Sequence, residues 1–170
     1  MKWIRNIILG ILVSIFLVIT HIGLLYLLPY PFNNVHLLLS VFVIMVMWSK
    51  SGLVVWLSFF SFFLLDLYSV SSFGTIFVSG TITILILYWF HRDVFTNRSF
   101  WTFIILGILG IILFRIFYTI SFYLLNFLRG EYFYVFGLNI FFIYMWELLF
   151  SMIFMAILYS ILIFLQKKSI

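Results

Sequence analysis

Residues 59–74 read FFSFFLLDLYSVSSFG and place one carboxylate, Asp66, near the end of an otherwise uncharged apolar segment. A charged side chain is costly to hold in hydrocarbon, so Asp66 needs a polar partner. Four small residues, Ser69, Ser71, Ser72 and Gly74, follow within the next eight positions, and a second apolar segment covers residues 75–90. This pattern predicts two apolar helices joined by a tight turn at a membrane surface. Asp66 can cap the second helix by accepting hydrogen bonds from backbone N–H groups near residues 72–74.

The composition is that of an integral membrane protein. Of the 170 residues, 67% are hydrophobic and only 8% are charged, and the mean hydropathy is +1.35. A soluble domain of this length could not hide so much apolar surface in its core. We therefore predict an all-α integral membrane protein that forms a single transmembrane domain over residues 1–170.

Short polar breaks divide the chain into six apolar segments, which predict about six transmembrane helices. The second segment has only about 15 residues, fewer than the roughly 20 that a perpendicular crossing needs, so it either thins the bilayer or lies inside the bundle. Pro29 and Pro31 are expected to end the first helix, and Asn33 or Asn34 to cap the second. The predicted segments are residues 3–28, 34–48, 53–68, 75–90, 100–128 and 138–166.

The basic residues are distributed unequally between the two sides of this topology. Seven lie on one side, Arg129 alone lies on the other, and Arg115 lies within a helix. The positive-inside rule then predicts a multi-pass membrane protein with six crossings and both termini in the cytoplasm. The same rule explains the net charge of +5 without a nucleic-acid partner. The seven residues are Lys2, Arg5, Lys50, Arg92, Arg98, Lys167 and Lys168.

Two charged residues lie at similar depths in the fifth and sixth segments. These are Arg115 and Glu147. An unpaired charge at such a depth costs at least about 2.5–3.5 kcal/mol, so we predict that the two form a buried pair. Asp66 is the alternative partner for Arg115. A ligand or proton pathway lined by these charges is the functional alternative to a purely structural pair.

Residues typical of metal sites and catalysis are sparse. The chain has no cysteine, and its three histidines, His21, His36 and His91, have no metal-binding spacing. We expect these histidines at different depths, with His21 hydrogen-bonded to a neighbouring helix. No phosphate-binding glycine loop or nucleophile motif is present in the sequence. We therefore expect neither an enzyme nor a metal ion or cofactor.

Small residues mark two helix faces that could pack closely. Gly10 and Ser14 share one face of the first segment, and Gly107 and Gly110 lie three apart in the fifth. Glycine and serine allow the backbones of membrane helices to approach each other. We expect these two faces to contact neighbouring helices.

Over roughly residues 25–125 the sequence resembles the bacterial rod-shape-determining MreD family. A Pro-containing external loop, PYPFNN, occupies residues 29–34, and a basic loop, HRDVFTNR, occupies residues 91–98. Between them stands the Leu-Leu-Asp-Leu sequence around Asp66, followed by a Ser-rich turn and a glycine. The family usually has glycine soon after the aspartate, whereas here Ser69 stands first and the glycine is delayed to Gly74.

The resemblance implies a non-enzymatic scaffold subunit of the cell-elongation machinery, or rod complex. Such a subunit binds the single-pass protein MreC and links peptidoglycan synthesis by the cell-wall synthase to MreB filaments, which maintains cell shape. The resemblance also implies the six-helix fold of the substrate-binding subunits (S-components) of energy-coupling-factor vitamin transporters. Asp66, Gly74, Arg115 and Glu147 are then candidates for structural or interaction roles.

The alternative function is that of a vitamin-binding transporter subunit. Those subunits typically carry an alanine-based small-residue motif on their first helix, whereas the only alanine here is Ala156. A closed cavity with convergent polar groups, open to the outer face, would favour the transporter function. A lipid-handling protein is a third alternative.

Overall fold

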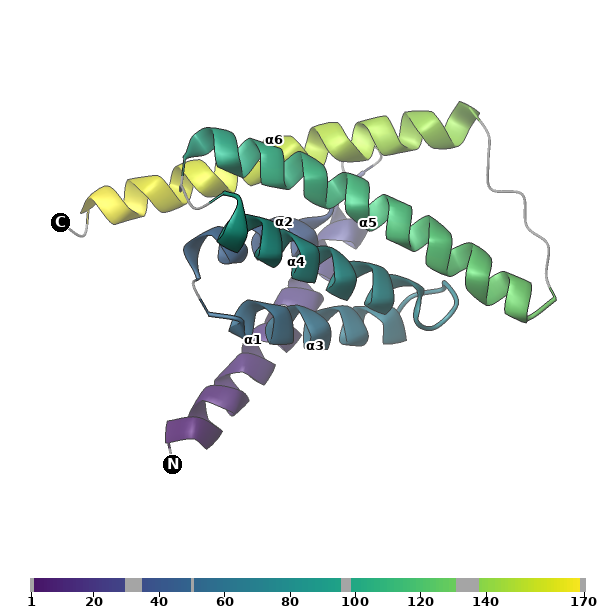
Figure 1. The fold of residues 1–170 in the computed structure, drawn as a ribbon, viewed down its shortest axis with the longest axis horizontal. Coiled ribbons are helices and arrows are strands. Elements are labelled where there is room, and N and C mark those ends of the chain that lie inside the picture. Colours follow the sequence, from purple (N-terminus) through teal and green to yellow (C-terminus); the bar gives the residue numbers. More distant parts are fainter. Residues whose placement is uncertain (1, 30–34, 50, 96–98, 131–137, 169–170) are drawn as a thin grey trace.

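The computed structural model describes residues 2–29, 35–49, 51–95, 99–130 and 138–168, and in these residues the chain forms six α-helices and no strand (Figure 1). The predicted all-α fold is therefore confirmed for this part of the chain. Helix α4 packs against both α3 and α5, α1 packs on α3, and α6 packs on α2 and α5. The helices are α1 (Lys2–Leu27), α2 (Leu37–Trp48), α3 (Leu53–Leu67), α4 (Thr75–Asp93), α5 (Phe100–Leu128) and α6 (Leu138–Lys168).

Four helices are long and apolar enough to cross a membrane, namely α4 and α5 over their whole length, α1 over Ile8–Leu27 and α6 over Phe142–Leu165. Large apolar side chains stay exposed on them, as Phe16 of α1 does at 69%. Such extended apolar surface is favourable in hydrocarbon and unfavourable in water. The fold is thus consistent with a membrane protein. The other two helices, α2 and α3, have 12 and 15 residues.

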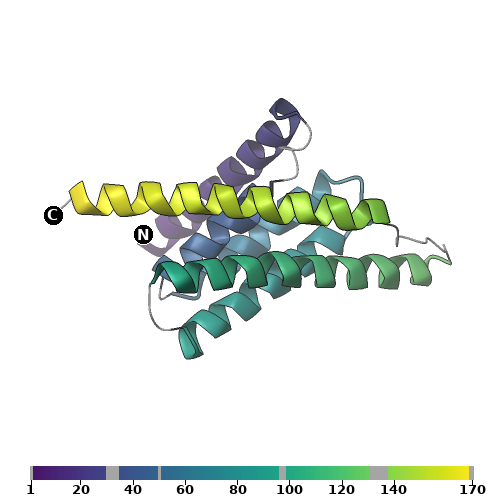
Figure 2. The ribbon, with the colours of Figure 1, turned by 90° about the horizontal axis from the view of Figure 1, so that it is seen from above.

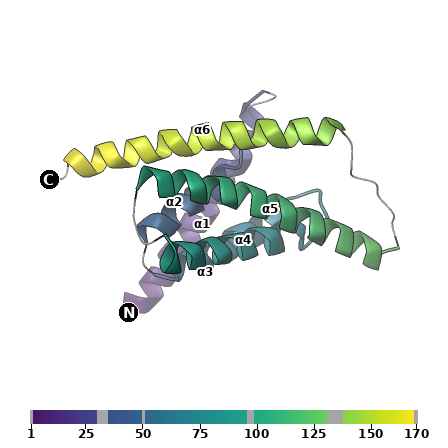
Figure 3. The ribbon, with the colours of Figure 1, turned by 45° about the horizontal axis from the view of Figure 1, so that its top comes forward.

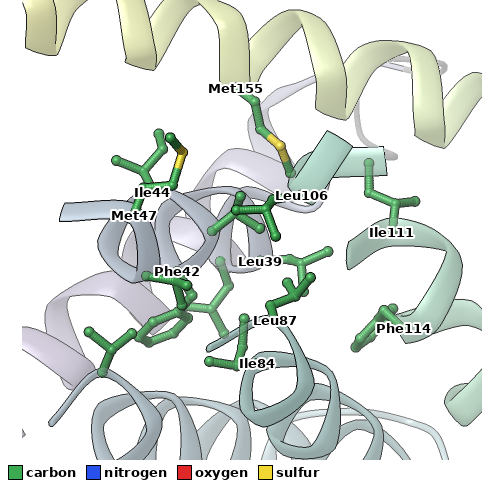
Figure 4. Packing of buried hydrophobic residues seen from close by; sticks show 14 of the residues in the cluster. Leu39, Phe42, Ile44, Met47, Ile84, Leu87, Leu106, Ile111, Phe114 and Met155 are labelled. Carbon is green, nitrogen blue, oxygen red and sulfur yellow. The ribbon is translucent and has the colours of Figure 1, made fainter. Parts of the chain in front are cut away.

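The short helix α2 forms the centre of the bundle. It contacts each of the other five helices, and nine of its twelve residues are buried. Its sequence is apolar on every face, as is typical of a helix that is surrounded by others. Figure 4 shows Leu39 and Phe42 of α2 beside Ile84 and Leu87 of α4, with Met155 of α6 on the other side. The sequence left two alternatives for this short segment, local thinning of the bilayer or a position inside the bundle, and the structure shows the position inside the bundle.

The start of α2 differs from the prediction. The helix begins at Leu37 with His36 in the N-cap position, and not at residue 34 with an asparagine cap. The predicted caps Asn33 and Asn34 lie outside the described residues, as does Pro31. The correction matters because it places the His36 ring at the end of a central helix.

The end of α4 also differs from the prediction. The helix continues to Asp93, so His91 and Arg92 form its last turn and do not belong to a loop. Basic side chains are favourable at a helix C-terminus, where the backbone carbonyls carry a partial negative charge. Of the basic residues used above to predict orientation, Lys50 and Arg98 lie outside the described residues.

The bundle has two different ends. One, which we call the turn end, holds the turn at residues 68–74 and the C-terminus of α5 (Figure 1). The other, the link end, holds the C-termini of α2 and α4 and the N-termini of α3 and α5 (Figure 1). The first residues of α1 and the last of α6 both lie toward the link end in the three views (Figures 1–3). Helices α5 and α6 run side by side in Figure 2 and diverge toward the turn end in Figures 1 and 3.

Small residues allow the closest helix contacts. A Cβ atom added at Gly10 would lie 3.2 Å from Leu57 of α3, and one added at Gly107 would lie 2.9 Å from the sulfur of Met155 in α6. These contacts confirm the two small-residue faces predicted from the sequence. The tightest contact was not predicted: a Cβ at Gly80 of α4 would lie 2.4 Å from the ring of Phe62 in α3.

Gly80→Ala is expected to destabilise the protein by about 1–3 kcal/mol, because the buried Phe62 ring, only 2% exposed, has little room to move. The thermal unfolding temperature in a mild detergent measures the effect. Gly23→Ala is the matched control, since no atom lies within 4 Å of a Cβ at that position, and alanine there is expected to be neutral or slightly stabilising. Equal unfolding temperatures for the two variants would show that the α3–α4 contact tolerates an added methyl group.

Candidate functional site

Asp66 organises the turn between α3 and α4, and its side chain is only 2% exposed. Its Oδ1 atom accepts a hydrogen bond of 2.9 Å from the backbone N–H of Ile76, and its Oδ2 atom accepts one from the N–H of Gly74. Both donors lie at the N-terminus of α4, where backbone N–H groups have no partner inside the helix and favour a negative charge. The predicted capping of the second helix by Asp66 is confirmed.

Gly74 adopts the left-handed conformation that this turn requires. Its φ angle is +100°, a region in which a residue with a Cβ atom is strained. In this conformation Gly74 occupies the N-cap position of α4 and donates its N–H to Asp66. Gly74, which lies further from the aspartate than the glycine of the MreD pattern, is therefore the residue at which the turn ends and α4 begins.

Hydrogen bonds hold the turn against the C-terminal end of α5, while its outer surface stays exposed. The Ser72 hydroxyl donates to Oδ1 of Asn126 at 3.3 Å, and the Arg129 guanidinium donates to the Ser72 hydroxyl at 3.4 Å. Val70 and Phe73 project from this turn with exposed fractions of 106% and 53%. The turn therefore presents two exposed apolar side chains at this end of the bundle.

Arg115 of α5 and Glu147 of α6 form the predicted buried pair. The guanidinium Nε donates to Glu147 Oε1 at 2.8 Å, and a terminal guanidinium nitrogen donates to Oε2, so the contact is bidentate. Glu147 is 1% exposed, whereas the Arg115 side chain is 25% exposed. The guanidinium carbon also lies 4.5 Å from the centre of the Tyr144 ring, within the range of a cation–π interaction.

His36 is a third member of this cluster, and it was not singled out in the sequence analysis. Its Nε2 atom lies 2.6 Å from Glu147 Oε1, and because an ionised carboxylate only accepts, the imidazole is the donor. Its backbone N–H donates to the Ser151 hydroxyl at 3.0 Å, and the edge of its ring meets Phe114 at a centroid distance of 4.8 Å. His36 therefore ties the start of α2 to α5 and α6.

A cavity of about 650 Å³ lies beside the charged cluster and extends toward the turn end. His36 and Arg115 line it, whereas Glu147 lies behind them and does not. His21 of α1 also lines it, so two histidines that are distant in the sequence lie on one cavity. The cavity further includes the exposed tyrosines Tyr26 and Tyr68 and the apolar residues Ile22, Leu25, Leu38, Phe62, Leu65, Ile76 and Phe114.

His21 is buried, as predicted, but the predicted hydrogen bond is not found at Nδ1. The residue is 4% exposed, and within the described part of the chain its Nδ1 atom has no hydrogen-bond partner. A buried polar atom without a partner costs about 1–3 kcal/mol.

The structure separates the four residues proposed from sequence into two sites. Asp66 and Gly74 form the turn, and Arg115 and Glu147 form the charged cluster; the carboxylate that pairs with Arg115 is Glu147, not Asp66. Sequence motifs could not have revealed the role of His36, because 115 residues separate it from Ser151, its partner on α6. Within the described residues, no three His, Asp or Glu side chains gather as a metal site needs.

No family model, curated protein or solved structure matches the chain. The functions discussed below therefore rest on the sequence pattern and on the geometry of the turn and the cavity.

Proposed function

We propose that this chain is a non-enzymatic scaffold subunit of a bacterial cell-elongation complex, similar to MreD. In this role it binds an MreC-like single-pass membrane protein and couples peptidoglycan synthesis to MreB filaments. Binding, and not turnover of a substrate, is its activity. The resemblance around Asp66 and Gly74 motivates the proposal.

The geometry of the turn end is the observation that supports this proposal best. Asp66 fixes the start of α4, and the bonds from Ser72 and Arg129 hold the turn on α5. The exposed Val70 and Phe73 therefore belong to a turn that hydrogen bonds attach to α4 and α5. Ordering such a turn on binding costs less conformational entropy than ordering a free loop, which favours association with a partner helix.

The topology that accompanies this proposal has six crossings, with the turn end outside the cell and both termini in the cytoplasm of the bacterial inner membrane. The bias of basic residues supports this orientation, and the ends of α1 and α6 at the link end fit an even number of crossings (Figure 1). The short helices α2 and α3 then cross as part of the bundle, with α2 shielded from lipid by its neighbours.

Val70→Glu tests the partner surface. The residue is fully exposed, so the fold is expected to remain intact, while a charge at this point should abolish co-purification of MreC and prevent restoration of rod shape in a depleted host. Val94→Glu is the matched control, because Val94 is also exposed, at 62%, but lies at the link end. Normal MreC binding and normal rods with Val70→Glu would contradict the proposed surface.

The cavity favours a second candidate function, that of a vitamin-binding transporter subunit. Its volume lies in the range of small-molecule sites, and polar groups converge on it from α1, α2 and α5. Mass spectrometry of the purified protein distinguishes the two candidates. A stoichiometric bound vitamin, together with normal rods in a deletion strain, would replace the scaffold proposal by the transporter function.

A further inference from the structure

We infer that the cavity beside Arg115, together with an apolar groove that adjoins it, binds an acidic amphiphile: a molecule with a phosphate or carboxylate head and a hydrocarbon chain. This binding site goes beyond the scaffold role proposed above and does not depend on MreC. It is a property of the isolated chain, and it is tested on the isolated chain.

The chemistry of the head group follows from the groups that face the cavity. The pair with Glu147 uses two of the five N–H donors of Arg115, leaving three donors beyond that pair. Glu147 is withdrawn behind Arg115 and His36, at 1% exposed, whereas those two side chains remain 25% and 23% exposed. The wall thus presents the remaining N–H donors of Arg115 to the cavity, while the carboxylate of Glu147 does not line it. An anionic acceptor group is the ligand that matches such a wall.

His21 provides an independent indication of a ligand. Its side chain lines the cavity, it is 4% exposed, and within the described residues its Nδ1 atom is without a hydrogen-bond partner. The cost of burying this atom is removed if a ligand supplies the missing partner. His21 on α1 then contacts the head group from the helix opposite Arg115 of α5, which lines the same cavity.

The chemistry of the tail follows from the second cavity. It has a volume of about 530 Å³, lies between α1 and α3, and shares Ile22 and Tyr68 with the first cavity. Its other lining residues are apolar or glycine, and Ile15 and Ile19 are exposed to the surroundings of the bundle at 39% and 64%. A hydrocarbon chain can therefore run from the polar cavity along this groove into the lipid. The remaining lining residues are Val18, Gly23 and Leu64.

Titration of the purified protein with decyl phosphate, followed by native mass spectrometry, tests the inference. We expect one decyl phosphate per chain, bound at least tenfold more tightly than 1-decanol, which lacks the charge, and than inorganic phosphate, which lacks the chain. Dioleoyl phosphatidic acid tests whether the ligand is a membrane phospholipid or a single-chain acid. Binding of this lipid identifies a membrane phospholipid, whereas binding of decyl phosphate alone identifies a single-chain acid.

Two variants locate the head and the tail. His21→Leu is expected to weaken decyl phosphate binding by about tenfold or more, the usual effect of losing one hydrogen bond to a charged group. The unfolding temperature without ligand should not fall, because the substitution removes an unpartnered polar atom; a merely structural histidine would give the opposite pattern. Gly23→Leu fills the groove, where a Cβ meets no atom within 4 Å, and is expected to weaken decyl phosphate binding without affecting inorganic phosphate.

Leu27→Phe is the control on α1, because this residue is 80% exposed and lines neither cavity. Equal affinities for 1-decanol and decyl phosphate would contradict the requirement for an acidic head group. Equal affinities for inorganic phosphate and decyl phosphate would contradict the requirement for a hydrocarbon chain. Absence of decyl phosphate binding, or wild-type binding by both His21→Leu and Gly23→Leu, would overturn the site as a whole.

Discussion

Arg115→Met is expected to destabilise the protein by about 3–5 kcal/mol, because it leaves the Glu147 carboxylate buried without its bidentate partner. Glu147 is 1% exposed and cannot turn to water, and the single bond from His36 replaces only part of the lost stabilisation. Thermal unfolding in detergent measures the change. Glu147→Met is expected to cost less, because Arg115 is 25% exposed and can reach water in the cavity.

The double variant distinguishes a coupled pair from two independent effects. Arg115→Met combined with Glu147→Met replaces both charges by apolar side chains of similar length, and its cost is expected to be at least about 1 kcal/mol less than the sum of the single costs. Strictly additive costs would mean that the two charges do not stabilise each other. His36→Phe in the Arg115→Met single variant shows how much of the remaining stabilisation of Glu147 comes from the imidazole.

Asp66→Ala is expected to cost at least about 2 kcal/mol, the second largest effect. The carboxylate accepts hydrogen bonds from Gly74 and Ile76, and each buried donor that loses its acceptor costs about 1–3 kcal/mol. The measurement is again the unfolding temperature, combined with proteolysis of the 68–74 turn, which should become faster once the start of α4 is no longer capped.

Asp66→Asn is the conservative control for this prediction. Its amide keeps one oxygen, so it can retain one of the two hydrogen bonds and is expected to lose about half as much stability. Asp93→Ala controls for the loss of any carboxylate, because Asp93 is 61% exposed. If Asp66→Ala unfolded at the wild-type temperature, the turn would not depend on this cap.

The helices, the capped turn and the charged pair were predictable because backbone polar groups and charges in a hydrocarbon environment must find partners within the protein. Runs of apolar residues must form helices to satisfy their backbone hydrogen bonds, and few other residues could neutralise Arg115, Glu147 or Asp66. The depth of each charge along its helix is readable from residue counts. The similar depths of Arg115 and Glu147 were the basis for predicting that they pair.

The errors arose where local patterns were used to place helix ends. The asparagines before α2 have the side chains preferred at N-caps, yet the helix starts at Leu37, where α2 meets the other helices. The basic residues after Phe90 were assigned to a loop, although the helix dipole favours them in the last turn of α4. Packing and capping together determine where a helix ends, and only the capping preferences can be read from the sequence.

The sequence by itself determined that the chain is helical and apolar enough for a membrane, and it limited the buried carboxylates that could pair with Arg115 to Glu147 and Asp66. The structure shows that Glu147 forms this pair and that Asp66 caps α4. Only the tertiary structure decided which faces of the helices meet: that α2 is central, that Gly80 packs on Phe62, and that His21 and His36 line one cavity. The physical reason is that a helix apolar on all sides does not specify its own rotation or tilt. These are set by the shapes of side chains on neighbouring helices.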